Sequence, residues 1–327
     1  MQHLDQIKCI NYNGFSPKFK DVLILRKGYY FIVNDYSITG DAPKDFIRLY
    51  EYGSCNKLNS KGWPLYIAKT GHKWYPNESI CEQLMTRLGE CFGINIAQSK
   101  LGIGNNQLRF LSKYFLEKDQ QLIHGAEIYS GFLSDDQFVK QVEDEGKARD
   151  FFTIRFTKRA LKFTFGENVT DIFNDFVRMV LFDAIIGNND RHYYNWGIVR
   201  HVKGKHKPFF SPVYDTARGL YWNESEENLS LRIAEPSIEK YVDNSRPKLG
   251  WENESDINHF KLIELLYMYR LDYNISDDVF KILSKSNLKN SLDVIQKEFK
   301  FLLSENRKNL ISKCLIKRFE KLENIIN

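Results

Sequence analysis

A long apolar helix followed directly by a crowded polar loop is the feature that most constrains this chain. In the segment 169–186, apolar residues recur at helical spacing and form one wide face, which indicates a helix buried against other elements. Gly187 ends this pattern, and the next ten residues, "NNDRHYYNWG", contain three Asn, an Asp, an Arg and a His. So many directional hydrogen-bonding groups beside a buried helix indicate a functional loop and not a simple surface connection.

The hydrophobic pattern changes from β-type to helical along the chain. The first third contains short runs rich in branched and aromatic residues, interrupted by a helical pattern at 77–93 with Asn77 as its N-cap. From about residue 127, helical periodicity prevails, and 135–163 reads as one or two helices. The expected strands are 46–52, 64–70, 96–103, 107–115, 196–200 and 208–213, with a hairpin over 21–35 that turns at Lys27-Gly28. The sequence therefore predicts an α+β fold in two lobes, a β-rich lobe at 1–117 and a mainly helical lobe at 118–327.

Composition and cysteine usage exclude several classes of protein. The 327 residues are 43% hydrophobic, which is enough for a large globular core. The net charge is only +5, from 47 basic and 42 acidic residues, so direct nucleic-acid binding is not expected. The five cysteines are scattered, without zinc-site spacing, which is typical of reduced thiols in the cytosol.

The sequence shows no sign of membrane insertion. It begins without the pattern of a cleavable signal peptide, and its apolar stretches are shorter than the roughly 20 residues of a membrane helix. We therefore expect a cytoplasmic protein, although a secretion route that uses no cleavable signal would leave no mark in the sequence.

Three polar residues follow the order found in kinase active sites. Asp190 and Asn195 lie in the polar loop, and Asp215 follows in "SPVYDTARG", after an apolar strand-like run. In protein kinases a loop Asp aligns the accepting hydroxyl, while an Asn soon after it and an Asp beyond a strand hold magnesium. Amide and carboxylate oxygens are the hard ligands that Mg²⁺ prefers. We therefore assign Asp190 as the catalytic residue, and Asn195 and Asp215 as metal ligands.

An upstream lysine completes this pattern. Lys69 lies at the end of the expected strand 64–70, ahead of the helix 77–93. A strand lysine can hold the α- and β-phosphates of ATP when a helix carboxylate fixes its ammonium group. Glu82 is the first choice for that carboxylate, and Glu78, one turn earlier, is the second. The ordered set that indicates a kinase dependent on ATP and Mg²⁺ is Lys69, Glu82, Asp190, Asn195 and Asp215.

Three stretches resemble one known family. "GNNDRHYYNWG", "SPVYDTARG" and "LIHGAEI" are similar to the HipA-like serine/threonine kinases, and the first is nearest to the short CtkA-like type. The resemblance covers about 46–270. It implies a two-lobed protein-kinase-like fold, binding of ATP and Mg²⁺, and transfer to a Ser or Thr of a protein, which could be the chain itself. It also implies a role as a toxin or effector, and an antitoxin as a partner.

The resemblance gives the same site residues and adds a nucleotide-binding segment. Asp190 corresponds to the catalytic Asp, Asn195 and Asp215 to the metal ligands, Lys69 to the ATP-binding Lys and Glu82 to the helix Glu. The segment 111–116 takes the hinge position, whose backbone would hydrogen-bond the adenine. The hinge residues expected to bind the cofactor are Leu111, Ser112, Lys113 and Tyr114.

The phosphate-covering loop departs from the kinase pattern. No GxGxxG occurs, and "YGSCNKLNSKG" (52–62) is expected at that position with only Gly53 and Gly62. Its serines, Ser54 and Ser60, are candidate autophosphorylation sites by position alone.

Several readings stay open beside the protein kinase. A phosphoinositide-type lipid kinase also carries a "DRHxxN" loop, and a kinase-shaped module could bind nucleotide or an antitoxin without turnover. Within the loop, we expect His192 to brace the backbone by hydrogen bonding and not to act as a base.

Overall fold

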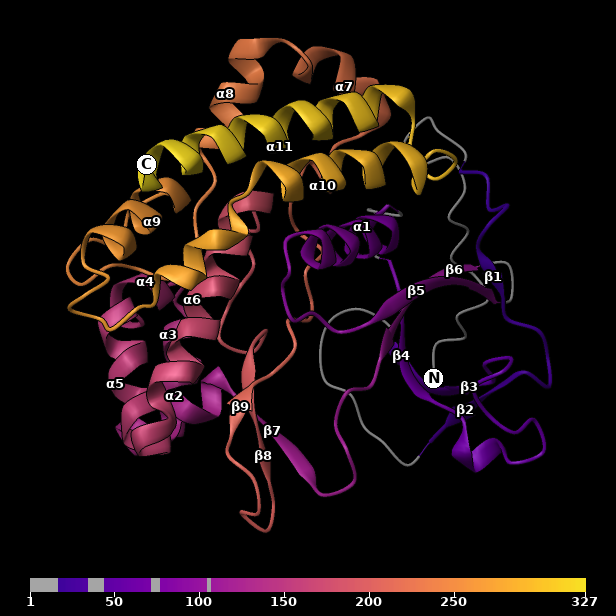
Figure 1. Cartoon of the computed structure of the whole chain (residues 1–327), viewed down its shortest axis with the longest axis horizontal. Helices are drawn as coiled ribbons and strands as arrows, with labels where there is room; N and C mark the ends of the chain where they lie inside the picture. The colour runs from indigo at the N-terminus through magenta and orange to yellow at the C-terminus, as the bar shows by residue number, and fades with distance from the viewer. Residues whose placement is uncertain (1–16, 35–43, 72–76, 105–106) are drawn as a thin grey trace.

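The structure is a computed structural model that describes residues 17–34, 44–71, 77–104 and 107–327 (Figure 1). The N-terminal part is a six-stranded sheet with one helix, α1 (Glu78–Cys91), and the C-terminal part is mainly helical. The strands are β1 (Leu23–Ile24), β2 (Tyr30–Val33), β3 (Lys44–Leu49), β4 (Leu65–Thr70), β5 (Ser99–Gly104) and β6 (Gln107–Lys113), in the spatial order β1-β5-β6-β4-β3-β2. This arrangement confirms the predicted α+β fold.

The six-stranded sheet curls around an apolar interior of its own. Leu25, just after β1 at one edge, packs with residues of β3, β4 and β6, and Tyr30 from β2 at the other edge packs against the same cluster. The buried members of this cluster are Leu25, Ile47, Leu49, Tyr66, Ala68 and Leu111. The curl brings the two edges of the sheet close enough for a short link, 25–29, to join β1 to β2.

The predicted hairpin over residues 21–35 is wrong. The turn does form, since the N–H of Tyr29 donates to the carbonyl of Arg26 at 3.0 Å and Gly28 has a φ of +84°. However, β1 pairs in parallel with β5, whereas β2 pairs with β3. A turn signal in the sequence fixes the local bend but not the partner of each strand, and here the partners lie on opposite edges of the sheet.

The C-terminal part combines helices with a small sheet. Antiparallel strands β7 (Gln120–His124), β8 (Gly197–His201) and β9 (Phe209–Phe210) form that sheet. The helices are α2 (Gly125–Leu133), α3 (Asp136–Asp144), α4 (Ala148–Phe151), α5 (Ile154–Phe165), α6 (Val169–Ile186), α7 (Glu226–Arg232), α8 (Glu235–Asp243), α9 (His259–Met268), α10 (Lys285–Lys297) and α11 (Glu305–Ile326). None of the described helices is both long and apolar enough to cross a membrane.

Most helices lie where the sequence predicts them, with local exceptions. The predicted helix 77–93 is α1, although the side chain of Asn77 makes no capping hydrogen bond. The segment 135–163, read as one or two helices, forms three, α3 to α5. The short helices α2, α7 and α8 were not predicted, because each spans no more than nine residues and shows too few apolar repeats to stand out.

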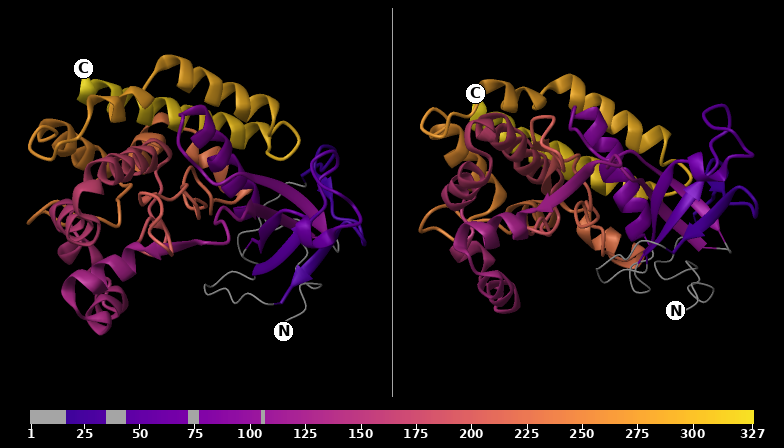
Figure 2. Two further views of the ribbon diagram at one scale, coloured as in Figure 1. Left: turned by 60° about the horizontal axis from the view of Figure 1, so that its bottom comes forward. Right: turned by 90° about the horizontal axis from the view of Figure 1, so that it is seen from below.

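The C-terminal helices reach back to the N-terminal part. Helix α1 packs against β5 and β6 on one side and against α10 on the other (Figures 1 and 2). Arg87 of α1 donates through Nε and Nη2 to the two carboxylate oxygens of Glu298, each at 2.8 Å. The division of the chain into lobes between residues 117 and 118 stays a prediction. Helix α10 belongs to the C-terminal side of that division, but it packs against α1 on the N-terminal side.

One buried arginine of α11 holds the ends of two other helices. Arg318 has no exposed surface; its Nε donates to the carbonyl of Ala184 at 2.7 Å, and its Nη1 donates to that of Val242 at 3.2 Å. These carbonyls lie in the last turns of α6 and α8, where the helix itself supplies too few donors. A positive charge at a helix C-terminus is also favourable. Arg318 therefore fixes α11 against both helices.

Replacement of Arg318 should destabilise the fold. We expect Arg318→Leu to lower the free energy of unfolding by about 2–4 kcal/mol, because the buried carbonyl of Ala184 loses its donor and the contact with the carbonyl of Val242 is lost as well. Lys313→Leu, an exposed change on the same helix, should shift it by less than about 0.5 kcal/mol. Urea unfolding of both variants tests this, and equal stability of the two would contradict it.

Candidate active site

The five residues of the predicted ordered set line one cleft of about 800 Å³. Its walls come from β3, β4, α1 and the end of β6 on one side, and from β7, α2, α3 and the loops after α6 and β9 on the other. The residues brought together are Lys69, Glu82, Asp190, Asn195 and Asp215. Side chains as far apart in sequence as residues 69 and 215 therefore share one solvent-accessible space.

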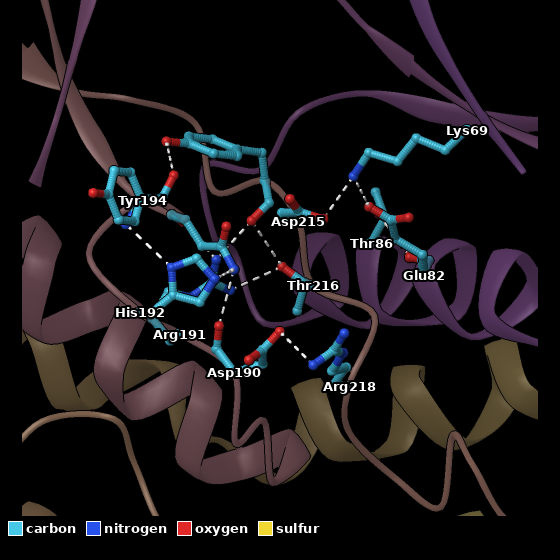
Figure 3. Close-up of polar contacts among 12 residues, drawn as sticks. Lys69, Glu82, Thr86, Asp190, Arg191, His192, Tyr194, Asp215, Thr216 and Arg218 are labelled. Carbon is cyan, nitrogen blue, oxygen red and sulfur yellow. Dashed lines mark hydrogen bonds and ion pairs between the residues drawn. The ribbon is translucent and has the colours of Figure 1, made fainter. Parts of the chain in front are cut away.

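Lys69 is held between two carboxylates at the end of β4. Its Nζ lies 2.7 Å from Oε1 of Glu82 and 2.7 Å from Oδ1 of Asp215 (Figure 3). Of the two glutamates considered for this contact, it is Glu82 that makes it. Although burial opposes its charge, the carboxylates of Asp215 and Glu82 hold the pKa of Lys69 above its usual range. The ammonium group therefore stays charged and points into the cleft.

The two carboxylates respond differently to this burial. Burial raises the pKa of Glu82 to about 7, against the opposing effect of the Lys69 ammonium group. Burial also acts on Asp215, but the charge and hydrogen bond of Lys69 hold the pKa of that carboxyl well below its usual range. Asp215 therefore stays ionised, the state in which a carboxylate can bind a cation.

The polar loop begins where α6 ends. Gly187 has a φ of +67°, a left-handed conformation that favours glycine, and it turns the chain out of the helix. The side-chain Nδ2 of Asn195 donates to the backbone carbonyl of Asp190 at 2.9 Å and lies 3.1 Å from Nε2 of His192. Because the amide nitrogen is directed into the loop, the carboxamide oxygen of Asn195 is the atom left to bind a ligand.

His192 braces the loop, as predicted. Its Nδ1 lies 3.3 Å from the N–H of Tyr194, and its Nε2 lies 3.1 Å from the amide of Asn195. A neutral imidazole accepts at one nitrogen only, so either tautomer makes one of these two contacts a hydrogen bond within the loop. Burial lowers the pKa of His192, so the ring stays neutral near pH 7.

A residue to which the sequence assigned no role in the site ties its segments together. Arg191 is buried, and its Nε and Nη2 donate to the two carboxylate oxygens of Asp183 at 2.8 and 3.1 Å. Its other donors reach the carbonyls of Asn195 and Tyr214 at 2.8 and 2.6 Å and Oγ1 of Thr216 at 2.9 Å. Asp183 lies within the apolar run of α6, where a carboxylate would be buried and would need a cationic partner. This was the signal in the sequence for a buried arginine nearby.

Arg191 also stabilises an unusual backbone conformation. Asp215 has a φ of +55°, which is uncommon for a residue with a side chain. Arg191 donates to Tyr214 and Thr216, the residues on either side of Asp215. Lys69 donates to the Asp215 carboxylate. Sites where backbone strain is maintained by surrounding contacts are often functional.

The predicted hinge is only partly in the cleft. Ser112, Lys113 and Tyr114 line it, whereas Leu111 does not, because its side chain is fully buried inside the curled sheet. The N–H of Tyr114 donates to the carbonyl of Leu65 at 2.8 Å, and that of Lys113 to the carbonyl of Gln98 at 2.8 Å. These two N–H groups are therefore not free for a ligand.

The next two residues offer the backbone groups that the hinge prediction required. Phe115 and Leu116 also line the cleft; both belong to the predicted hinge segment 111–116, although neither was among the four residues expected to bind the cofactor. Within the described parts of the chain, their N–H groups have no hydrogen-bonding partner.

The prediction that residues 52–62 cover the phosphates is wrong. Strands β3 and β4 pair antiparallel, with Lys44 opposite Lys69 and Arg48 opposite Leu65. The loop 53–62 therefore joins the strands at the end of β4 away from Lys69, at a distance of about 13 Å along the strand. Ser54 and Ser60 lie at that far end too. The segment that precedes β3 in the sequence, 35–43, lies outside the described residues.

A histidine lies buried behind the polar loop. His259 lines a small cavity of about 20 Å³ together with Asp183, Asn188 and Arg191. Among the described residues neither of its ring nitrogens has a hydrogen-bonding partner. Burial, with a smaller effect from the charge of Arg318, lowers the pKa of His259 well below 6.5.

Comparison with known proteins identifies the family. Residues 36–264 match the model of the HipA-like C-terminal domain. The chain belongs to the HipA-like family. Among solved structures it resembles the Helicobacter pylori proinflammatory kinase CtkA, with a TM-score of 0.71, 17% identity, and coverage of 93% of this chain and 96% of that one. This likeness confirms the HipA-like, CtkA-type resemblance and the kinase-like fold.

A second solved structure is more distant. It is HipA of Shewanella oneidensis MR-1, in a toxin–antitoxin complex with HipB and operator DNA, with a TM-score of 0.48 and 13% identity. The match covers 88% of this chain and 65% of that one. No curated protein sequence matches this chain.

Loss of Arg191 should destabilise the protein strongly. We expect Arg191→Met to lower the free energy of unfolding by about 3–5 kcal/mol, because Asp183 is left as a buried, unpaired charge. The double change Asp183→Leu and Arg191→Met should cost less than the sum of the single changes. Arg155→Met, at an exposed ion pair with Glu252, is the matched control. A loss below about 1 kcal/mol in urea unfolding of Arg191→Met would show that the pair is dispensable.

The buried His259 should make stability depend on pH. Because its pKa in the folded state is depressed, its contribution is present above pH 6.5 and is lost as the pH falls. His259→Leu should therefore lose stability less steeply than the wild type between about pH 6.5 and 5, by roughly 1 kcal/mol per pH unit. Urea unfolding across this range measures both slopes, with Lys313→Leu as control; parallel slopes for wild type and His259→Leu would contradict it.

Proposed function

We propose that this chain is a protein kinase that uses ATP and Mg²⁺ to phosphorylate Ser or Thr hydroxyls. The observation that carries the proposal is the arrangement of Lys69, whose ammonium group joins Glu82 and Asp215 at 2.7 Å each in the cleft that also contains Asp190 and Asn195. Phosphoryl transfer requires positioning and charge stabilisation more than covalent chemistry, and this cleft supplies both.

The residues present fit a nucleotide and a magnesium ion. A volume of about 800 Å³ lies in the usual range of small-molecule sites. The carboxamide oxygen of Asn195 and the carboxylate of Asp215 are hard donors that suit Mg²⁺. Lys69 would hold the α- and β-phosphates, and the N–H groups of Phe115 and Leu116 would donate hydrogen bonds to the adenine. We propose these two residues, with Ser112, Lys113 and Tyr114, as the hinge side of the site, without Leu111.

Asp190, which lines the cleft, is the residue that we propose acts on the acceptor. Its carboxylate would orient the hydroxyl of the substrate and accept its proton as the oxygen bonds to the γ-phosphorus. The bond from that phosphorus to the bridging oxygen breaks at the same time, and ADP leaves with the electron pair. Bound magnesium would neutralise charge on the phosphates. Arg191 holds the backbone carbonyls of Asn195 and Tyr214, and Lys69 holds the carboxylate of Asp215, which supports the two side chains proposed to bind the metal.

A protein acceptor is favoured over a lipid head group. The three sequence stretches that resemble the HipA-like serine/threonine kinases support this choice, and the family match covers residues 36–264. The acceptor could be the chain itself. Location in the cytoplasm, a toxin or effector role and an antitoxin partner stay predictions of the sequence.

Substitution at the proposed catalytic residues should separate transfer from binding. Asp190→Asn should reduce phosphoryl transfer by about 10²–10⁴-fold and leave ATP binding intact, because only proton acceptance and alignment are lost. Asp215→Asn should weaken ATP binding in the presence of Mg²⁺, because a ligand charge is removed. Radiolabelled ATP with a protein mixture, and in parallel with phosphoinositide vesicles, measures transfer; titration calorimetry measures binding.

Controls make the outcome decisive. Asp293→Asn, an exposed ion-paired carboxylate on α10, should transfer phosphate as the wild type does. Transfer by Asp190→Asn at the wild-type rate would remove Asp190 from the mechanism. Transfer to vesicles alone would establish a lipid kinase, and ATP binding by the wild type without any transfer would establish a binding module.

A further inference from the structure

Arg218 lies three residues beyond Asp215 and lines the same cleft. Its carbonyl accepts a hydrogen bond from the N–H of Asn189 at 3.3 Å, and the N–H of Leu220 donates to the carbonyl of Ile186 at 3.2 Å. Between them, a Cβ on Gly219 would lie 2.6 Å from the carbonyl oxygen of Ile186, so only glycine lets the segment lie this close. The backbone therefore fixes the origin of the Arg218 side chain beside the polar loop.

Downstream contacts fix the same segment from the other side. Tyr221 has a φ of +62°, its N–H donates to the hydroxyl of Tyr241 at 2.8 Å, and its carbonyl accepts from Nη1 of Arg307 at 3.0 Å. Arg307 is fully buried in α11. The segment that carries Arg218 is thus anchored on both sides.

The guanidinium group of Arg218 lies beside the proposed catalytic carboxylate. Its Nη1 is 3.2 Å from Oδ2 of Asp190, and its central carbon lies 5.2 Å from the centre of the Trp222 ring (Figure 3 shows the pair with Asp190). The side chain of Arg218 is 44% exposed and that of Asp190 25%. An ion pair so accessible to solvent is weak, and a stronger anion can displace it.

Arg218 differs from the other cations of the site in its unused donors. An arginine carries five N–H donors. Those of Arg191 are directed to Asp183 and to groups on both neighbouring segments, and the charge of Lys69 is shared by two carboxylates. Among the described residues, no well-aligned hydrogen bond connects the guanidinium of Arg218 to a protein acceptor. It therefore offers donors to a ligand in the cleft.

We propose that Arg218 binds the phosphoryl group that is transferred, on the acceptor side of the cleft. This inference rests on the proposed function. In the empty site Arg218 pairs with Asp190; with ATP bound, its N–H groups turn to the γ-phosphoryl oxygens, whose charge would otherwise face the Asp190 carboxylate directly. A planar guanidinium can hold two such oxygens at once. Arg218 forms and breaks no covalent bond and exchanges no proton during the transfer.

Nucleotide binding tests this role without requiring turnover. The affinities of wild type, Arg218→Gln and Arg218→Lys are measured by calorimetry with Mg²⁺, for ADP and for the β,γ-imido analogue of ATP. Arg218→Gln should weaken binding of the analogue by about tenfold to a hundredfold and leave ADP binding nearly unchanged, because only the γ-phosphoryl contact is lost. Arg218→Lys should keep part of the preference, since it retains the charge without the fork.

Matched measurements complete the experiment. Arg155→Gln removes another exposed arginine, paired with Glu252 outside the cleft, and should bind both nucleotides as the wild type does. In phosphoryl-transfer assays, Arg218→Gln should lower kcat by about 10²–10³-fold. Unfolding in urea verifies that each variant is folded.

The outcomes separate this proposal from the proposed function. Equal affinity of wild type and Arg218→Gln for the analogue would overturn the role of Arg218, and so would an equal loss of both nucleotides, which would indicate a structural role. If the wild type binds neither nucleotide, both proposals fail. If the preference for the analogue depends on Arg218 but no phosphate is transferred, the phosphoryl site stands and the kinase function fails.

Discussion

The buried pair of Arg191 and Asp183 is the interaction on which the rest of the site depends. Burial of a charged pair is costly, and it is favourable only when nearly every hydrogen-bonding group is satisfied. Arg191 meets this condition by donating to the end of α6, to the polar loop and to the residues that flank Asp215. One side chain thus sets the distance between the segments that carry the proposed catalytic residue and the proposed metal ligands.

The N-terminal half of the site is positioned by a different means. Glu82 lies on α1, which is held between the sheet and α10, so it meets Lys69 without help from a bound ligand. The C-terminal helices also hold the segment after Asp215 through Arg307 and Tyr241. Helices α10 and α11, at the end of the chain, thus contribute to both halves, and the arrangement of charges around Lys69 is built into the folded state.

The sequence predicted the site best at positions where the chemistry requires one particular residue type. The polar loop, Lys69 and Asp215 could be found because their order along the chain is that of kinase sites, and the wide apolar face of α6 specifies a buried helix whatever surrounds it. Strand pairing was harder, because the Lys27-Gly28 turn is the same whether β1 and β2 pair or lie on opposite edges. For the same reason, the loop 53–62 was placed beside the phosphates until the register of Lys44 with Lys69 located it elsewhere.

Two arginines of neighbouring segments show why charge alone does not predict a role. In the sequence, Arg191 and Arg218 are equally polar residues of loop segments, and neither position reveals its burial. In the fold, Arg191 uses its donors within the protein and is almost fully buried, so its charge is committed to structure. Arg218 lies over Trp222 and stays half-exposed in the cleft, and within the described residues its ion-pair partner is the carboxylate of Asp190. A cation with unused donors beside a carboxylate is suited to bind an incoming anion. For this reason we propose Arg218, and not Arg191, as the residue that binds the phosphoryl group.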